Sequence, residues 1–230
     1  MGVYNNNKIG ILLEDLFIYD GSFNLNLNND INLLLNVVDN ISKLHIKYYY
    51  ATSNDIEETV ILNFKKMNEI SNYSALIKEK FELFKTKNKI FITERMLDVM
   101  DNIYANYDKI LNELSSFPLN LCHGDLKSPN IFYKNDYEPY FLDWQYINLS
   151  KGVTDIVFLL VESIDFNIVT TTIVINYYYK LINNQNPFYT YETYLFELKL
   201  ALCCFPFFVT IWFNSEDSDG LNDKTFPLVL

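Results

Sequence analysis

Three polar residues in the middle of the sequence have the types and the spacing that phosphoryl transfer requires. Asp125 and Asn130 fall in Leu-Cys-His-Gly-Asp-Leu-Lys-Ser-Pro-Asn, residues 121–130, and Asp143 follows in Phe-Leu-Asp-Trp, residues 141–144. An acid such as Asp125 can orient a hydroxyl nucleophile, whereas an amide and a second acid, here Asn130 and Asp143, can hold Mg²⁺ on nucleotide phosphates. The group therefore predicts phosphoryl transfer from a magnesium–nucleotide complex to a hydroxyl.

A β-hairpin is expected to position these residues. Residues 119–123 and 130–133 are short and β-prone, and a Lys-Asn-Asp turn leads from them to a partner strand at residues 140–143. Asp125 would lie in the loop before the hairpin, and Asp143 at the end of its second strand. Both carboxylates would then face the same site. The aromatic residue after Asp143 can pack the metal-binding loop against the body of the domain.

Most of the remaining sequence has the apolar periodicity of helices. Helices are expected from the N-cap pair Asn29-Asp30 to residue 48, and over residues 60–70, 76–84, 96–114, 153–163, 167–182 and 191–204. Residues 9–13 are expected to form a buried strand, Gly21-Ser22 a break, and the apolar run at residues 200–213 a helix and turn interrupted at Pro206. The expected fold class is α+β, mainly α, with a small catalytic β-hairpin.

The composition excludes several classes of partner. The chain has 230 residues, 50% of them hydrophobic, which is enough for a sizeable core. A net charge of −11 disfavours binding to nucleic acid, because such binding needs basic residues to neutralise phosphates. No apolar run reaches the roughly 20 residues of a membrane span. Three cysteines and a polar, Asn-rich start favour a reducing, cytoplasmic location without a disulfide framework.

The central motif resembles the catalytic loop of the aminoglycoside phosphotransferase and choline kinase superfamily. Members share a protein-kinase-like fold and phosphorylate hydroxyl groups of small molecules; their loop reads His-Gly-Asp, as residues 123–125 do, where protein kinases usually read His-Arg-Asp. Leu-Asp-Trp at residues 142–144 is similar to their metal-binding motif. The resemblance implies ATP and Mg²⁺ as cofactors, Asp125 as catalytic base, and Asn130 and Asp143 as Mg²⁺ ligands.

A second match places the chain relative to the two lobes of that fold. Ile-Leu-Leu-Glu-Asp-Leu at residues 11–16 is similar to the hinge strand between the lobes, which implies that backbone groups near Glu14 and Asp15 meet the adenine. On this likeness residues 1–20 are the hinge strand and the start of the C-terminal lobe, and residues 21–230 are the helical C-terminal lobe. The family's N-terminal lobe is then missing from the sequence.

Three shorter matches extend the likeness along the chain. Residues 41–45 resemble the helix that carries a Leu-His pair, which implies a structural role for His45. Gly-Val-Thr-Asp at residues 152–155 resembles the helix start whose acid, here Asp155, braces the catalytic loop. The segment at residues 205–213 is similar to the ecdysteroid-kinase-like and choline-kinase-like branch of the superfamily.

Alternatives to an active kinase remain open. A metal hydrolase is disfavoured because His123 is one of only two histidines and no third ligand converges with Asp125 and Asp143. A half-kinase without its N-terminal lobe can instead be an inactive binding or interaction module, or a non-functional fragment. An apolar hinge face at Ile9, Ile11 and Leu13 can promote self-association or the docking of a separate N-lobe chain.

Several other charged residues can either contact the substrate or simply be solvated. Lys127 can contact a phosphate or the substrate, or can simply be solvated. Glu162, Asp165 and the acidic run at residues 216–219 can face a cationic substrate, although a solvated surface is the better interpretation. The expected substrate is a small molecule with a hydroxyl group.

Overall fold

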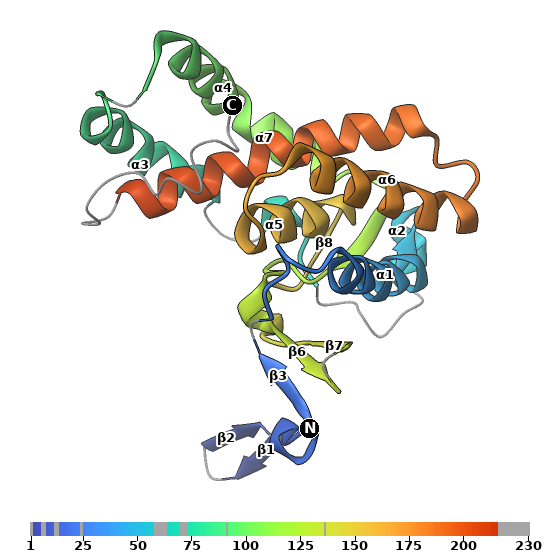
Figure 1. Cartoon of the computed structure of the whole chain (residues 1–230). Coiled ribbons are helices and arrows are strands. Elements are labelled where there is room, and N and C mark those ends of the chain that lie inside the picture. Colours follow the sequence, from blue (N-terminus) through green and yellow to red (C-terminus); the bar gives the residue numbers. More distant parts are fainter. Residues whose placement is uncertain are drawn as a thin grey trace.

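A computed structural model of the chain describes residues 2–5, 8–11, 14–23, 25–57, 64–69, 73–90, 92–135 and 137–215. Its helices are α1 (Ile31–Lys47), α2 (Ser53–Glu57), α3 (Tyr73–Lys87), α4 (Glu94–Leu114), α5 (Val153–Ser163), α6 (Ile168–Gln185) and α7 (Tyr191–Ser215) (Figure 1). The strands between them are short and form small antiparallel sheets. The expected α+β, mainly α, fold class is thereby confirmed.

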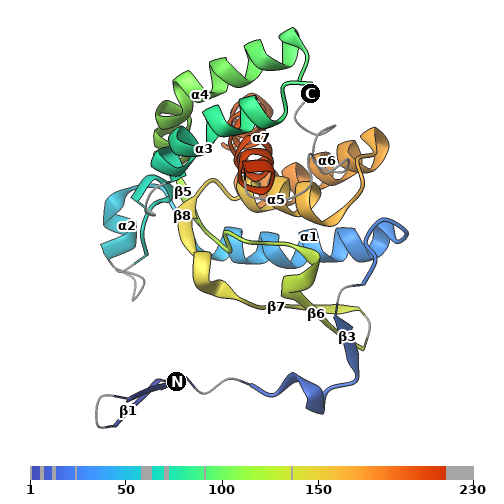
Figure 2. The ribbon, with the colours of Figure 1, turned by 90° about the vertical axis from the view of Figure 1, so that its left-hand side faces the viewer.

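Helix α7 is the centre of the helical body. It packs against α3, α4 and α5, while α1 packs against α6 (Figure 2). The apolar stripe of α1 is buried at Leu34, Val37, Val38 and Ile41, as its sequence period requires. Asp30 caps this helix, because its carboxylate accepts hydrogen bonds from the backbone N–H groups of the second and third helical residues at 3.0 and 3.1 Å.

Two three-stranded antiparallel sheets hold the catalytic segment. One has the order β3 (Gly21–Phe23), β6 (Ile131–Lys134), β7 (Glu138–Phe141), and the other β4 (Tyr49–Tyr50), β5 (Leu119–Cys122), β8 (Asn148–Ser150). The β6–β7 hairpin is the one expected from the sequence. The loop with Asp125 therefore leaves one sheet at the end of β5 and enters the other at the start of β6.

A separate hairpin lies near the N-terminus, away from the helices (Figures 1 and 2). It pairs β1 (Gly2–Asn5) with β2 (Lys8–Ile11). The strand expected over residues 9–13 is thus present as far as Ile11, and residues 12 and 13 lie outside the described part of the chain. The acidic run at residues 216–219 also lies outside it. Among the helices of the described residues, none has the length and apolar character that crossing a membrane would need.

The prediction of a break at Gly21-Ser22 is wrong, since both residues belong to strand β3. A Cβ atom on Gly21 would lie only 2.3 Å from the backbone oxygen of Tyr133 in β6. The glycine therefore permits a close approach of two strands. From the sequence alone, a glycine in such a strand cannot be told from a glycine in a turn.

The helix expected over residues 60–70 is wrong at residues 64–66, and of its described residues only Met67–Glu69 form a short 3-10 helix. Residues 60–63 and 70 lie outside the described residues, but Phe64 and Lys65 are not helical. The backbone oxygen of Lys65 accepts a hydrogen bond from Leu149 at 2.9 Å, and Lys66 forms an isolated bridge to the same residue. Pairing with β8 thus replaces helical hydrogen bonds here.

The expected interruption at Pro206 does not occur, because α7 continues through it to Ser215. Phe205, Phe207 and Ile211 on either side are buried. Phe207 packs against Phe81 of α3 with the ring centroids 5.4 Å apart. The packing of this aromatic segment outweighs the hydrogen bond that a proline removes from a helix.

Candidate active site

Asp125 and Asn130 lie in direct contact at the centre of the β5–β6 loop. The Asn130 amide nitrogen donates to the Asp125 carboxylate oxygen Oδ2 at 2.9 Å and to the Asp125 backbone oxygen at 2.9 Å. Both residues are buried. Because the nitrogen of Asn130 is committed to Asp125, its Oδ1 oxygen is the atom left to bind a cation.

The hairpin brings the backbone next to Asp143 into contact with Asn130. The backbone oxygen of Asn130 accepts a hydrogen bond from Leu142 at 2.9 Å, which joins the end of the catalytic loop to the residue before Asp143. Asp143 itself has left-handed backbone angles (φ 59°, ψ 62°) and an exposed side chain. Hard carboxylate and amide oxygens fit Mg²⁺, so Asp143 and Asn130 are suitable ligands. Their role as Mg²⁺ ligands stays a prediction.

Trp144 packs the loop of Asp143 against the catalytic loop, as its place in the sequence suggests. The centroids of the Trp144 and His123 rings are 4.5 Å apart, and the Trp144 indole nitrogen donates to the Phe141 oxygen at 2.8 Å. His123 is fully buried; its Nε2 lies 2.8 Å from the Leu142 oxygen, and its Nδ1 accepts from the Asp125 N–H at 3.2 Å. Since both ring nitrogens are engaged, His123 is not available as a metal ligand beside Asp125, which argues against the hydrolase alternative.

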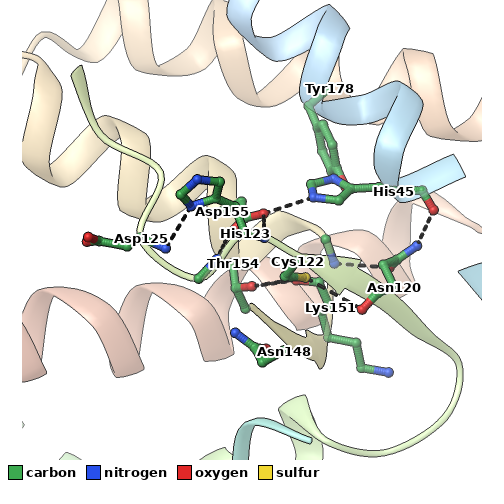
Figure 3. Close-up of polar contacts among 12 residues, drawn as sticks. His45, Asn120, Cys122, His123, Asp125, Asn148, Lys151, Thr154, Asp155 and Tyr178 are labelled. Atoms are coloured by element: carbon green, nitrogen blue, oxygen red, sulfur yellow. Dashed lines mark hydrogen bonds and ion pairs between the residues drawn. The ribbon is translucent and has the colours of Figure 1, made fainter. Parts of the chain in front are cut away.

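A buried carboxylate braces the catalytic loop (Figure 3). Asp155 accepts hydrogen bonds from the backbone N–H groups of His123 at 2.7 Å and Gly124 at 2.9 Å. Its Oδ2 also lies 3.1 Å from Nε2 of His45, whose Nδ1 is 3.0 Å from the Tyr178 hydroxyl. The geometry agrees with the roles expected for His45 and Asp155.

The charge of Asp155 is maintained despite its burial. Burial alone would raise the pKa of this carboxyl, but the hydrogen bond and charge of His45, with the donors of the catalytic loop, outweigh it and hold the pKa below its usual value. An ionised Asp155 can accept from both backbone N–H groups at once. A protonated one would lose part of that capacity.

Two glycines allow the loop and its brace to approach each other. Gly124 has φ +81°, and a Cβ atom there would lie 2.1 Å from the Tyr146 backbone oxygen. A Cβ atom on Gly152, at the start of α5, would lie 2.3 Å from the Tyr178 hydroxyl and 2.8 Å from Nδ1 of His45. Any larger side chain at either position would displace the catalytic loop or its brace.

The structure brings two further charged residues to Asp125. Nζ of Lys127 lies 3.0 Å from Asp125 Oδ1, so Lys127 is paired with the candidate base and is not simply solvated. Glu162 is half-buried on α5; burial raises the pKa of its carboxyl, the charge of Lys127 lowers it, and that of Asp125 raises it. Asp165, in contrast, is exposed.

The sequence analysis did not place Glu162 near Asp125, although the spacing of Glu162 from Asp155 indicated this position. Glu162 follows Asp155 by seven residues, two turns of one helix, and such residues share a face. Since Asp155 was expected to face the catalytic loop, Glu162 could have been expected there too. For Lys127, spacing along an irregular loop offers no comparable signal.

Glu14 and Asp15, the expected adenine-binding residues, are exposed and lie just before a short 3-10 turn at Leu16–Ile18. The Tyr19 hydroxyl donates to the Glu14 carboxylate. Both acids belong to the segment between β2 and β3, which precedes the helical body. Their part in nucleotide binding stays a prediction.

Comparison with known proteins agrees with the geometry. The model of the ecdysteroid kinase-like family matches residues 35–186, a range that includes the catalytic loop, Asp143 and Asp155. Protein LicA of Haemophilus influenzae is 25% identical over 136 residues, which cover 59% of this chain and 43% of LicA. The chain thus spans less than half the length of this relative.

Solved structures share the fold. Choline kinase from Cryptosporidium parvum has a TM-score of 0.51 and 13% identity, with 92% of this chain and 66% of that chain covered. LicA in complex with AMP has a TM-score of 0.52 and 14% identity, with coverages of 87% and 61%. At these identities the likeness shows the fold alone. The resemblance noted in the sequence is confirmed by the family match together with these structures.

Proposed function

The chain belongs to the ecdysteroid kinase-like family, and we propose that it transfers the γ-phosphoryl group of ATP to a hydroxyl group of a small molecule. The observation that carries this proposal is the braced pair of Asp125 and Asn130, with Asp143 joined to it through Leu142 and the Asn130 backbone oxygen. The fold shared with proteins named choline kinase, and with a LicA structure that contains AMP, supports it.

In this proposal Asp125 orients the acceptor hydroxyl and receives its hydrogen bond. Asn130 holds Oδ2 of Asp125 in place, so the carboxylate does not rotate as the nucleophile approaches. Oδ1 of Asn130 and the carboxylate of Asp143 would bind Mg²⁺, which neutralises phosphate charge when bound. Lys127 adds a positive charge beside Asp125, at the point where the oxygens of the transferred phosphoryl group would arrive.

The charges near Asp125 favour a class of substrate. Lys127 is paired with Asp125, and Glu162 lies within electrostatic range of both, in a chain with a net charge of −11. A substrate with a positive charge next to its hydroxyl would be attracted to such a site. We therefore propose a cationic amino alcohol as the favoured acceptor, in line with the names of the choline kinases that share the fold.

The nucleotide base has a proposed position as well. Backbone groups near Glu14 and Asp15, in the segment between β2 and β3, would meet the adenine. Residues of a separate N-lobe chain, or of a second copy of this chain, would then complete the nucleotide site. An ordinary sizing experiment with Mg²⁺ and ATP tests this assembly: a nucleotide-dependent shift to a larger species is expected, and an unchanged monomer speaks against a second copy.

Transfer itself is tested with ATP, Mg²⁺ and a panel of acceptors: choline, ethanolamine, an aminoglycoside and a hydroxylated steroid. Phosphorylated products are identified by mass spectrometry for the native chain, for Asp125→Asn, and for Asp98→Asn, an exposed residue of α4, as the matched control. The proposal predicts a product with at least one acceptor, retained in Asp98→Asn and reduced about 10²–10⁴-fold in Asp125→Asn. Equal rates in Asp125→Asn would refute the assigned base. Binding without any product would favour an inactive binding module.

A further inference from the structure

A cavity lies next to the C-terminal end of α1 and is separate from Asp125. It has a volume of about 550 Å³ and is formed by the end of α1, strands β4 and β5, the end of α6 and the start of α7. This volume is within the range of roughly 300–1,000 Å³ that small-molecule sites occupy. Asp125, Asn130 and Asp143 do not line it, so it is not part of the candidate active site.

Aromatic and aliphatic groups form most of its wall. Tyr49, Tyr189 and Phe188 contribute rings, and Ile46 and Ile182 contribute aliphatic surface. Phe188 is 93% exposed, an unusual position for a phenyl ring next to a cavity. A ligand with an aromatic ring would cover apolar surface that is now in contact with water.

Apart from His45, whose two ring nitrogens are engaged by Tyr178 and Asp155, the polar groups of the wall are uncharged. Asn120, Gln185, Asn186 and Thr193 supply amide and hydroxyl groups, and none of the described lining residues is Asp, Glu, Lys or Arg. These groups can orient the hydroxyl or amide of a ligand. A charged ligand would find no counter-ion among them, and desolvation would oppose its binding.

A second buried ion pair is linked to the cavity wall through Tyr189. Lys151 and Glu197 lie 3.2 Å apart, and both side chains are buried. The Tyr189 hydroxyl donates to the other oxygen of Glu197, and the Lys151 ammonium donates to the backbone oxygens of Ser116 and Pro118 at 2.9 and 2.8 Å. The charges of this pair are therefore already satisfied, and a neutral occupant is favoured.

The wall of the cavity is connected to the brace of the catalytic loop. The amide nitrogen of Asn120 donates to the His45 backbone oxygen at 2.9 Å, and its amide oxygen accepts from the Gly152 N–H at 3.0 Å. His45 contacts Asp155, which in turn accepts from Gly124. Figure 3 shows His45 and Asn120 on one side of Asp155 and Asp125 on the other.

We propose that this cavity is a second binding site, for a neutral aromatic small molecule with a hydroxyl or amide group, and that its occupancy alters the catalytic loop through His45 and Asp155. A ligand packed against the end of α1 and Asn120 would fix the position of His45. The hydrogen bonds of Asp155 to the catalytic loop would then change with occupancy. This goes beyond the transfer reaction, and it stands whether or not that reaction occurs.

The test uses 4-hydroxybenzamide as the probe and NMR spectra of the ¹⁵N-labelled chain at pH 7 without nucleotide. Saturable shift changes are expected at Tyr49, Asn186 and Tyr189, with a Kd near or below about 1 mM. The Gly124 amide is expected to shift with the same Kd. The charged analogue 4-hydroxybenzoate should bind at least tenfold more weakly.

Two variants locate the site. Thr193 is an exposed residue of α7 in the cavity wall, so Thr193→Trp should fill the mouth and weaken probe binding at least tenfold. Thr172→Trp places the same side chain at an exposed position of α6 outside the cavity and should leave binding unchanged. Urea unfolding checks that both variants are folded.

Four results would overturn the proposal. These are the absence of saturable shifts in the native chain, equal affinity of the folded Thr193→Trp variant, equal affinity for 4-hydroxybenzoate, and saturation at the cavity with an unchanged Gly124 amide. The last of these would remove the connection to the catalytic loop.

Discussion

The buried carboxylate of Asp155 offers the sharpest test of how the catalytic loop is held. Asp155→Asn keeps the size and shape of the side chain but replaces one acceptor oxygen by an NH₂ group. In the native chain the two oxygens accept from His123 N–H, Gly124 N–H and His45 Nε2 at 2.7, 2.9 and 3.1 Å. An asparagine has only one oxygen for these partners, so its NH₂ group must face a backbone donor.

The energetic cost follows from the hydrogen bonds that the substitution removes. A buried backbone N–H left without an acceptor costs about 1–3 kcal/mol, and a hydrogen bond to a charged group contributes about 1.5–3 kcal/mol. Because the side chain is 1% exposed, water cannot replace the missing acceptor. We expect Asp155→Asn to lower the free energy of unfolding by about 3 kcal/mol, and Asp155→Ala, which removes all the acceptors, by about 4 kcal/mol.

Urea unfolding measures these free energies, and hydrogen exchange reports the protection of the Gly124 amide. Asp98→Asn is the matched control, because Asp98 is exposed on α4 and the change should stay within about 0.5 kcal/mol. A free energy of unfolding of Asp155→Asn within about 0.5 kcal/mol of the native value, with the Gly124 amide still protected, would show that Asp155 does not hold the catalytic loop.

Three further predictions use the same region. Gly124→Ala should lower the free energy of unfolding by about 3 kcal/mol, measured in urea, because its Cβ would lie 2.1 Å from a backbone oxygen at φ +81°. Since the pKa of Asp155 is lowered on folding, the unfolded chain takes up its proton first; stability should therefore fall as the pH drops below about 4, and urea midpoints of Asp155→Asn should fall less steeply there. Lys127→Met should lower kcat for phosphoryl transfer about 10–100-fold, and Lys127→Arg should lower it less, as steady-state rates with ATP would show. An unchanged kcat in Lys127→Met would contradict a role for its charge.

Much of the helical body was predictable because local signals and tertiary packing agree. The stripe of α1, with Asp30 as its cap, and the long helix α4 follow directly from apolar periodicity. The β6–β7 hairpin was predictable for the same reason: two β-prone segments flank a turn at Asn135, which has φ 51°.

The errors arose where tertiary contacts overrule local propensity. Gly21 has the residue type of a turn, but in the structure it allows strand β3 to approach Tyr133 closely. Lys65 lies in a segment with helical periodicity, but its backbone oxygen accepts a hydrogen bond from Leu149 instead. Pro206 is tolerated because Phe207 and Ile211 beyond it are buried. None of these partners is near in sequence, so a local pattern cannot reveal them.

For the candidate site, the sequence predicted the residues better than their surroundings. Asp125 and Asn130 were identified from a motif of short spacing, and the brace at Asp155 from the family resemblance, because it is 32 residues from His123. The hydrogen bond between Asp125 and Asn130 was not predicted. The position of Lys127 depends on the path of an irregular loop, and that of Glu162 on how α5 is rotated toward it. The positions of the charged side chains around Asp125 could therefore be found only from the three-dimensional structure.

We propose that Asp143, with Asn130, forms a magnesium–nucleotide site beside Asp125. Calorimetric titration of ATP into the native chain, with and without Mg²⁺, tests it most directly, alongside Asp143→Ala and the exposed control Asp98→Ala. We predict saturable, Mg²⁺-dependent binding that is retained in Asp98→Ala and lost in Asp143→Ala. Equal binding by Asp143→Ala, or no binding of ATP by the native chain in the presence of Mg²⁺, would contradict the claim.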